Sequence, residues 1–127
     1  LVTEENHLDP SRNLVSTVTY DYDSLGKIIK ITTTQGVTTL MTSYEYNILG
    51  KIEKETITAN AIPQLRITYT HSGSISTGFC EIYDSITWIP AGTIFKTYNN
   101  SGMIIEEDSR DVSGTSTLKT VYEYFEG

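Results

Sequence analysis

The chain has 127 residues, enough for one domain with its own core, and its 16 acidic and 9 basic side chains give a net charge of -7. Nucleic acids and anionic membrane surfaces attract basic patches, so this charge balance argues against both as partners. Strand formers are abundant, with 20 Thr, 15 Ile and 9 Tyr against three Ala, and no run of 18 apolar residues occurs. The composition predicts an all-β fold without a membrane-spanning helix.

The first segment, residues 1–13, is acidic, contains Pro10 and shows neither a two-residue nor a 3.6-residue hydrophobic period. Chain ends of this kind are often poorly ordered. We therefore predict an N-terminal tether over residues 1–13, followed by a single β domain over residues 14–127.

A repeated pattern follows the tether: a Tyr, a Gly four residues later and an Ile two residues after that. The four copies are Tyr22-Gly26-Ile28, Tyr46-Gly50-Ile52, Tyr69-Gly73-Ile75 and Tyr98-Gly102-Ile104, and a fifth begins at Tyr122-Glu123-Tyr124. We expect Gly26, Gly50, Gly73 and Gly102 to complete tight turns, because glycine adopts a left-handed backbone at little cost.

In the first copy, Asp23 leads into Gly26, as in a hairpin loop built from a type I turn followed by a left-handed residue. That loop predicts that Tyr22 faces Ile28 and that Tyr20 faces Lys30. The second copy gives the pairs Tyr46–Ile52 and Tyr44–Lys54 in the same way. The tyrosines would then share one face of a sheet, with the two lysines among them.

Alternation of apolar and polar residues predicts strands at 14–23, 26–34, 37–47, 50–59, 64–71, 74–83, 92–99, 102–110 and 116–125, with a short extra strand near 86–89. No segment has the pattern of an amphipathic helix, so no helix is expected to cover the tyrosine-bearing face. An antiparallel meander of about nine or ten strands would bury that face as a rolled open sheet or an up-and-down barrel.

The sequence Tyr20-Asp21-Tyr22-Asp23-Ser24-Leu25-Gly26-Lys27-Ile28 and its copy at residues 44–52 resemble the YD-repeat of Rhs-type bacterial proteins. The chain is also similar to short YD-like envelope lipoproteins of unassigned function. The resemblance covers residues 14–127 and implies an antiparallel sheet in an exported protein of the periplasm or cell surface, with a lipid anchor upstream. It brings no catalytic residue to this chain.

A tyrosine-lined interior suggests one function, the binding of a small ligand or a glycan. The candidate residues are Trp88, Tyr20, Tyr44 and Tyr122, and the pattern does not identify the ligand. Trp88 lies within residues 78–92, the longest departure from the repeat, where we expect either an exposed aromatic platform or a plug that closes one end of a barrel. The alternative is that the tyrosine rings fill the core.

Five apolar residues interrupt the polar face in the C-terminal half, namely Phe95, Met103, Ile105, Val121 and Phe125. They predict an interface, either with a protein partner or with a second copy of the chain. His7 and His71 are far in sequence from each other and from Cys80, and no metal, phosphate or nucleophile motif is present. We therefore expect no enzyme activity, metal or cofactor, and interpret the chain as a non-catalytic structural or protein-interaction module.

Overall fold

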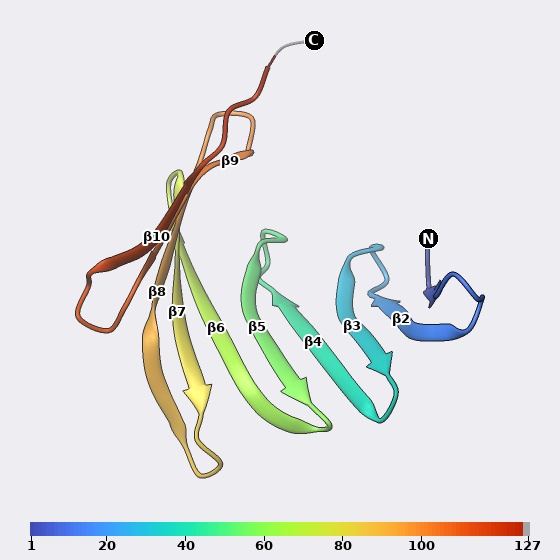
Figure 1. Ribbon diagram of the computed structural model, residues 1–127. Helices are drawn as coiled ribbons and strands as arrows, with labels where there is room; N and C mark the ends of the chain where they lie inside the picture. The colour runs from blue at the N-terminus through green and yellow to red at the C-terminus, as the bar shows by residue number, and fades with distance from the viewer. Residues whose placement is uncertain (126–127) are drawn as a thin grey trace. The chain divides into compact units, whose positions relative to one another are not determined.

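The computed structural model describes residues 1–125, which contain ten strands joined by turns and loops and no helix (Figure 1). The strands are β1 (Glu4–Leu8), β2 (Leu14–Tyr22), β3 (Ile28–Gln35), β4 (Thr38–Tyr46), β5 (Ile52–Ala59), β6 (Ile62–Ser72), β7 (Ile75–Tyr83), β8 (Trp88–Tyr98), β9 (Ile104–Arg110) and β10 (Ser116–Val121). Within the described residues, nothing helical is long and apolar enough to cross a membrane.

The strands form one antiparallel sheet whose strand order follows the chain order from β1 to β10. This confirms the predicted antiparallel meander of nine or ten strands. β1 and β10 stand at the two ends of the order, whereas a barrel would need hydrogen bonds between them. Of the two predicted forms, the described ladders therefore correspond to the open sheet.

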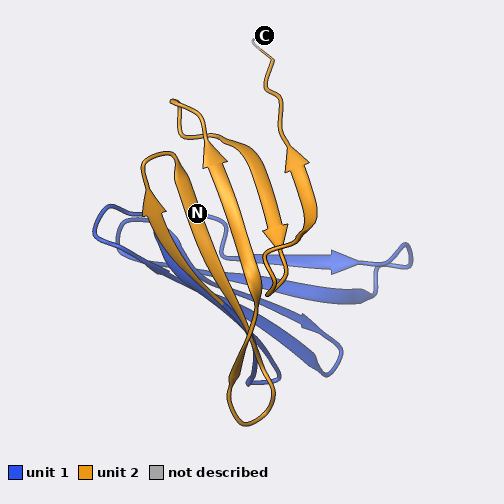
Figure 2. Ribbon diagram, turned by 90° about the vertical axis from the view of Figure 1, so that its left-hand side faces the viewer, with its two compact units in different colours: residues 1–66 blue, residues 67–127 orange. Residues whose placement is uncertain are grey.

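The chain divides into two compact units, residues 1–66 and residues 67–127 (Figure 2). In the first unit, which holds β1 to β5 and the start of β6, none of the residues is buried. In the described part of the second, the buried side chains are Ile67, Tyr69 and Ser76, with 8%, 7% and 3% of their surface exposed. Considered separately, each unit is a single layer of sheet, so its stability depends on ladders and cross-strand pairs rather than on a thick core.

The segment predicted as a tether contains β1, which pairs with β2 from Glu4–Thr19 to Leu8–Leu14. A turn joins the two strands, in which the Asp9 amide donates to the Asn13 carbonyl and the Asp9 carboxylate accepts the Asn13 amide, both at 2.9 Å. Arg12 has a φ of 65° at the position where the repeat elsewhere has glycine. The pattern was not visible in the sequence because it lacks that glycine.

A five-residue loop led by Asp or Asn, here called the Asx loop, closes several of the hairpins. In the copy Asp23–Lys27, the Asp23 amide donates to the Lys27 carbonyl at 2.8 Å and the Gly26 amide donates to the Asp23 carbonyl at 3.1 Å. The Asp23 carboxylate accepts the Leu25 and Lys27 amides, both at 2.9 Å. The same loop occurs at Asn47–Lys51, Asn99–Met103 and Asp111–Thr115. Gly26, Gly50 and Gly102 have φ values of 82°, 79° and 81°, the left-handed conformation that this loop requires.

The third copy of the repeat folds differently from the others. Gly73 has a positive φ of 59°, but β6 continues to Ser72 and β7 begins at Ile75, so the loop contains only Gly73 and Ser74. Tyr69 therefore lies inside β6 instead of ending the strand. The residue after Tyr69 is Thr70, which has no carboxylate or amide to accept the loop amides as Asp23 does.

A β-bulge follows each of the first two Asx loops and changes the predicted register. Tyr22 faces Ile28 as predicted, but Tyr20 faces Ile31, and the prediction that it faces Lys30 is wrong. Ile29 is the extra residue, so every later side chain of β3 is moved to the other face. Lys30 consequently lies opposite Asp21, with 3.6 Å between Nζ and Oδ2.

The second hairpin repeats this correction. Tyr46 faces Ile52 as predicted, but Tyr44 faces Glu55 instead of Lys54. Lys54 faces Glu45, with 3.8 Å between Nζ and Oε2. In both hairpins the lysine is therefore removed from the tyrosine-bearing face and joins an exposed ion pair on the other.

We expect Gly92→Ala to destabilise the second unit far more than Gly114→Ala. A Cβ at Gly92 would lie 2.2 Å from the Arg110 carbonyl oxygen, in addition to the strain of a φ of +130°, whereas a Cβ at Gly114 meets nothing within 4 Å. Gly114→Ala should cost only the left-handed strain of about 1–2 kcal/mol, and Gly92→Ala should cost at least about 3 kcal/mol more. Urea unfolding followed by circular dichroism measures both, and equal losses would contradict the close approach of β8 to β9.

We expect Ala61→Gly to stabilise the β5–β6 hairpin. Its two-residue loop consists of Asn60 and Ala61, whose φ values are 49° and 67°. Such loops favour Asn-Gly, because a Cβ is strained at positive φ. The gain should be about 0.5–1 kcal/mol after the entropy that glycine adds to the unfolded chain. Ala59→Gly in the adjoining strand is the matched control and should destabilise; a loss in both variants would argue against the loop.

Candidate functional site

All the tyrosine rings of the first unit, and those of the second except Tyr83, lie on one face of their sheet, which we call the tyrosine face. In the first unit it carries Tyr20, Tyr22, Tyr44 and Tyr46, and in the second Tyr69, Tyr98, Tyr122 and Tyr124. The register places Tyr20 opposite Ile31, and Ile31 opposite Thr42, which lies two residues before Tyr44. Because alternate residues of a strand share a face, the tyrosines of β2 and β4 point to the same side.

Tyrosine hydroxyls join strands where the backbone ladder stops. The β3–β4 ladder ends at the pair Lys30–Ser43, two residues short of Ile28. The Tyr46 Oη then donates to the Ile28 carbonyl oxygen at 2.6 Å. The same bond joins Tyr124 to the Ile104 carbonyl at 2.6 Å and Tyr22 to the Val2 carbonyl. The phenol thus supplies the donor that the neighbouring strand no longer provides.

Lys27 connects the first two Asx loops. Its Nζ donates to the Gly50 carbonyl oxygen at 2.9 Å and lies 5.0 Å from the centroid of the Tyr46 ring. A cation at this distance over an aromatic ring is attracted to the π-electrons. Lys27 and Tyr46 therefore hold the loop end of the first unit together, at the border of its tyrosine face.

Burial and nearby carboxylates keep several of these phenols protonated. Burial raises the pKa of Tyr44 and Tyr46, with the Glu55 carboxylate adding to it at Tyr44 and Asp23 adding to it at Tyr46. Burial and Glu5 raise the pKa of Tyr20, whose Oη donates to the Glu5 Oε1 at 3.3 Å. At neutral pH these hydroxyls are therefore hydrogen-bond donors rather than phenolates.

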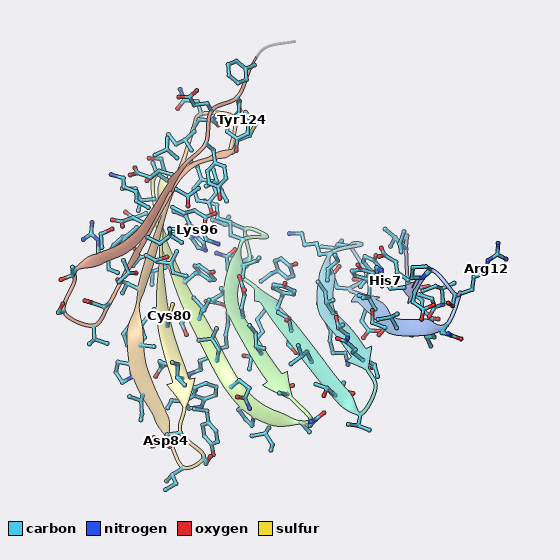
Figure 3. All side chains as sticks on the ribbon, viewed as in Figure 1. His7, Arg12, Cys80, Asp84, Lys96 and Tyr124 are labelled. Carbon is cyan, nitrogen blue, oxygen red and sulfur yellow. The ribbon has the colours of Figure 1, made fainter. Side chains whose placement is uncertain are left out.

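In the second unit, polar groups gather beside the buried Tyr69. The Nδ1 of His71 lies 2.5 Å from the Oγ of Ser76, and the His71 and Tyr69 rings stack with centroids 6.3 Å apart. Lys96, labelled in Figure 3, faces Ser76 across β7 and β8. Its Nζ lies 3.4 Å from the Tyr69 hydroxyl and 5.0 Å from the ring centroid.

A serine hydroxyl hydrogen-bonded to a histidine is the arrangement that activates a nucleophile. In this cluster, however, Ser76 is only 3% exposed, so its hydroxyl is out of reach of a substrate. We interpret the cluster as the packed centre of the second unit. This cluster was not predicted, because the Tyr–Gly pattern at residues 69–73 indicates a longer loop than the two-residue loop Gly73–Ser74 that places His71 beside Ser76. The signal for the shorter loop is a Gly-Ser pair between two strand-forming runs.

The predicted ligand residues do not form one site within the units. Trp88 begins β8, and its ring packs against Tyr83 at a centroid distance of 5.2 Å, on the face opposite Ser76 by alternation along β7. Trp88 is also far from Tyr122. The Tyr122 hydroxyl donates to Glu107, which faces Lys96, and Lys96 lies eight residues, or roughly 26 Å, along β8 from Trp88. Residues 78–92 form the far half of the β7–β8 hairpin, with Asp84 in its tip (Figure 3). In the first unit, Tyr20 and Tyr44 share a face with β3 between them.

The five apolar residues predicted as an interface differ in their surroundings. Phe95 lies under the Arg110 guanidinium, whose Cζ is 4.6 Å from the ring centroid, and Ile105 is partly buried. Met103, Val121 and Phe125 are 39%, 65% and 89% exposed. The most exposed members, Val121 and Phe125, therefore lie at the end of β10 and after it, whereas Met103 lies in the loop before β9.

Acidic residues near the C-terminus serve the hairpin itself. The Glu106 Oε1 lies 2.7 Å from the Lys119 Nζ, and the Asp108 carboxylate accepts the Ser116 hydroxyl at 2.5 Å and the Arg110 Nε at 3.0 Å. These bonds hold the pKa of Asp108 below its ordinary value. Within residues 1–125, no three His, Cys, Asp or Glu side chains are placed to hold a metal ion together.

The comparisons with known proteins assign no family. No family model matches the chain, and no curated protein matches it in sequence. It is similar to a solved structure of a protein of unknown function from Bacteroides fragilis NCTC 9343, with 10% sequence identity, a TM-score of 0.41, and coverage of 94% of this chain and 90% of that chain. A TM-score of this size does not establish a shared fold.

We expect Tyr46→Phe to lower the free energy of unfolding by about 1 kcal/mol near neutral pH, because it removes the bond to the Ile28 carbonyl. The raised pKa of Tyr46 means that the folded chain favours the neutral phenol, so this contribution is complete below about pH 10 and is lost as the pH rises through the folded-state pKa. The gap between wild type and variant should therefore narrow above pH 10. Urea titrations at a series of pH values measure it: no difference near neutral pH would contradict the hydrogen bond, and a gap that stays constant above pH 10 would contradict the raised pKa.

Proposed function

We propose that the protein is a non-catalytic β module of the YD-repeat type, belonging to an exported bacterial envelope protein, and that its tyrosine face binds another protein. The observation that supports this most is the state of the first unit, in which four tyrosines share a face of a single sheet layer and no residue is buried. Partly exposed aromatic surface of this extent is enriched at protein–protein contacts.

The chemistry of the face also favours a protein over a small ligand. Tyrosine combines a large apolar ring with a polar tip and loses little conformational entropy on binding, as in the contact surfaces of many complexes. Tyr46 and Tyr22 are already held by hydrogen bonds to backbone carbonyls, so their rings are fixed before a partner arrives. A small ligand would instead require a concave site with converging polar groups.

The direct test is hydroxyl-radical footprinting of the tyrosines, in the purified chain and in intact cells that express it. We expect Tyr44 and Tyr46 to react readily in the purified chain and to be protected in cells, because a partner covers their face. Tyr83, which packs against Trp88 on the opposite face of the other unit, is the internal control and should react equally in both. Equal reactivity of Tyr44 and Tyr46 in the two samples would contradict binding at this face.

The proposed location is tested separately by cell fractionation. The exported protein should be recovered with the envelope and should be cleaved when protease is added to cells with a permeabilised outer membrane. Recovery in the cytosolic fraction, protected from that protease, would contradict export. It would not contradict binding at the tyrosine face, which the footprinting experiment tests.

A further inference from the structure

The first and last hairpins are copies of one another, 102 residues apart. Residues 2–23 and 104–125 share a Glu-Glu pair, an Asp that leads a loop, and a final Tyr-x-Tyr. The registers correspond pair by pair, and a bulge falls at the same place in both. The hydrogen bond from Tyr20 to Glu5, at 3.3 Å, recurs from Tyr122 to Glu107, at 3.4 Å. β10 is therefore equivalent to β2, and β1 is equivalent to β9.

This equivalence leaves β10 with one side unoccupied in the described chain. β2 pairs with β1 on one side and with β3 on the other, whereas β10 pairs with β9 and ends the strand order. We call its outer side, over residues 116–125, the β10 edge. Tyr124 and Phe125, at the end of this edge, are 51% and 89% exposed. An unpaired strand edge is a template for another strand.

The charges of the repeat indicate which strand fits the β10 edge. The residue before the final Tyr of β2 and β4 is acidic, and it faces a lysine of the next strand: Asp21 faces Lys30, and Glu45 faces Lys54. In the hairpin β8–β9 the same position holds Thr97, and the facing residue is Glu106. In these three hairpins, therefore, an acidic residue before the final Tyr faces a lysine, and where that residue is the neutral Thr97 the facing residue is a glutamate. β10 is followed by Glu123 at this position, so its matching strand carries lysine.

The β1 strand of a second copy does not meet this requirement. β1 is equivalent to β9, and its residue at the lysine position is Glu4, the equivalent of Glu106. Pairing of β10 with β1 of a second copy would place Glu4 opposite Glu123. Like charges directly opposite one another destabilise a ladder, so electrostatic repulsion disfavours pairing of β10 with β1 of a second copy.

We propose that the β10 edge binds an extended segment of a partner protein by strand addition, and that this segment has an apolar residue followed two places later by lysine. The segment runs antiparallel to β10, with its apolar residue opposite Tyr124 and its lysine opposite Glu123, as Ile28 and Lys30 lie against β2. Backbone hydrogen bonds supply affinity, and the Glu–Lys pair supplies selectivity. The β10 edge shares Tyr122 and Tyr124 with the tyrosine face of the second unit, whereas the footprinting test above follows Tyr44 and Tyr46 of the first unit, so the two experiments test the two proposals separately.

The probe is a synthetic peptide with the sequence of residues 26–35, titrated into the isotopically labelled full chain and followed by amide chemical shifts. The control peptide carries Lys30→Glu. We expect shifts at residues 116–125 with the first peptide, and binding roughly two- to tenfold weaker with the control, because an exposed attraction is replaced by a repulsion. A chain with Glu123→Lys should reverse the order of the two peptides.

Three outcomes would overturn the proposal. The first is equal binding of the two peptides to both chains, or no binding at millimolar concentration. The second is a set of shifts confined to β2 and β4, which would mean that the peptide displaces β3 instead of adding to the edge. The third is concentration-dependent association of the wild-type chain in sedimentation whose strength changes with Glu123→Lys, which would identify a second copy as the occupant.

Discussion

One extra residue after each Asx loop decides which face of the sheet carries charge. Ile29 and Glu53 are the bulged residues of the first two hairpins, and each moves the following lysine away from the tyrosines. The lysines then meet Asp21 and Glu45 on the opposite face. Without the bulge, two ammonium groups would lie among the tyrosine rings, because a one-residue change of register exchanges the faces of a strand. Both the uniform aromatic face and the charge pairing that distinguishes the β10 edge from β1 depend on this extra residue.

The sequence was informative wherever a local signal determines the backbone. Asp23 and Gly26, three residues apart, predict the loop and the pair Tyr22–Ile28, because an Asx side chain and a left-handed glycine act within five residues. The bulge had no such signal, since Ile29 and Glu53 are ordinary strand residues. β1 was missed for a related reason: Arg12 occupies the left-handed position that glycine holds elsewhere, so the loop was not recognisable.

The polar centre of the second unit depends on contacts that no spacing pattern describes. His71, Ser76 and Lys96 come from three strands and meet beside Tyr69 because the β6–β7 loop has two residues instead of the five of an Asx loop. Gly78 leaves room for this cluster, since a Cβ there would lie 2.8 Å from both Ile67 and Tyr69 side-chain atoms. Burial of Ser76 then makes a serine–histidine pair a packing element rather than a nucleophile, which a sequence motif alone would not distinguish.

The register of the first hairpin tests this account most directly, and inter-strand nuclear Overhauser contacts measure it in the purified chain. The bulged register predicts contacts between the side chains of Tyr20 and Ile31, and between the Asp21 and Lys30 backbones, while Tyr22 contacts Ile28. Contacts between Tyr20 and Lys30 would show a regular hairpin with the lysine on the aromatic face. That result would contradict the separation of charge from the tyrosines on which the proposed binding surfaces depend.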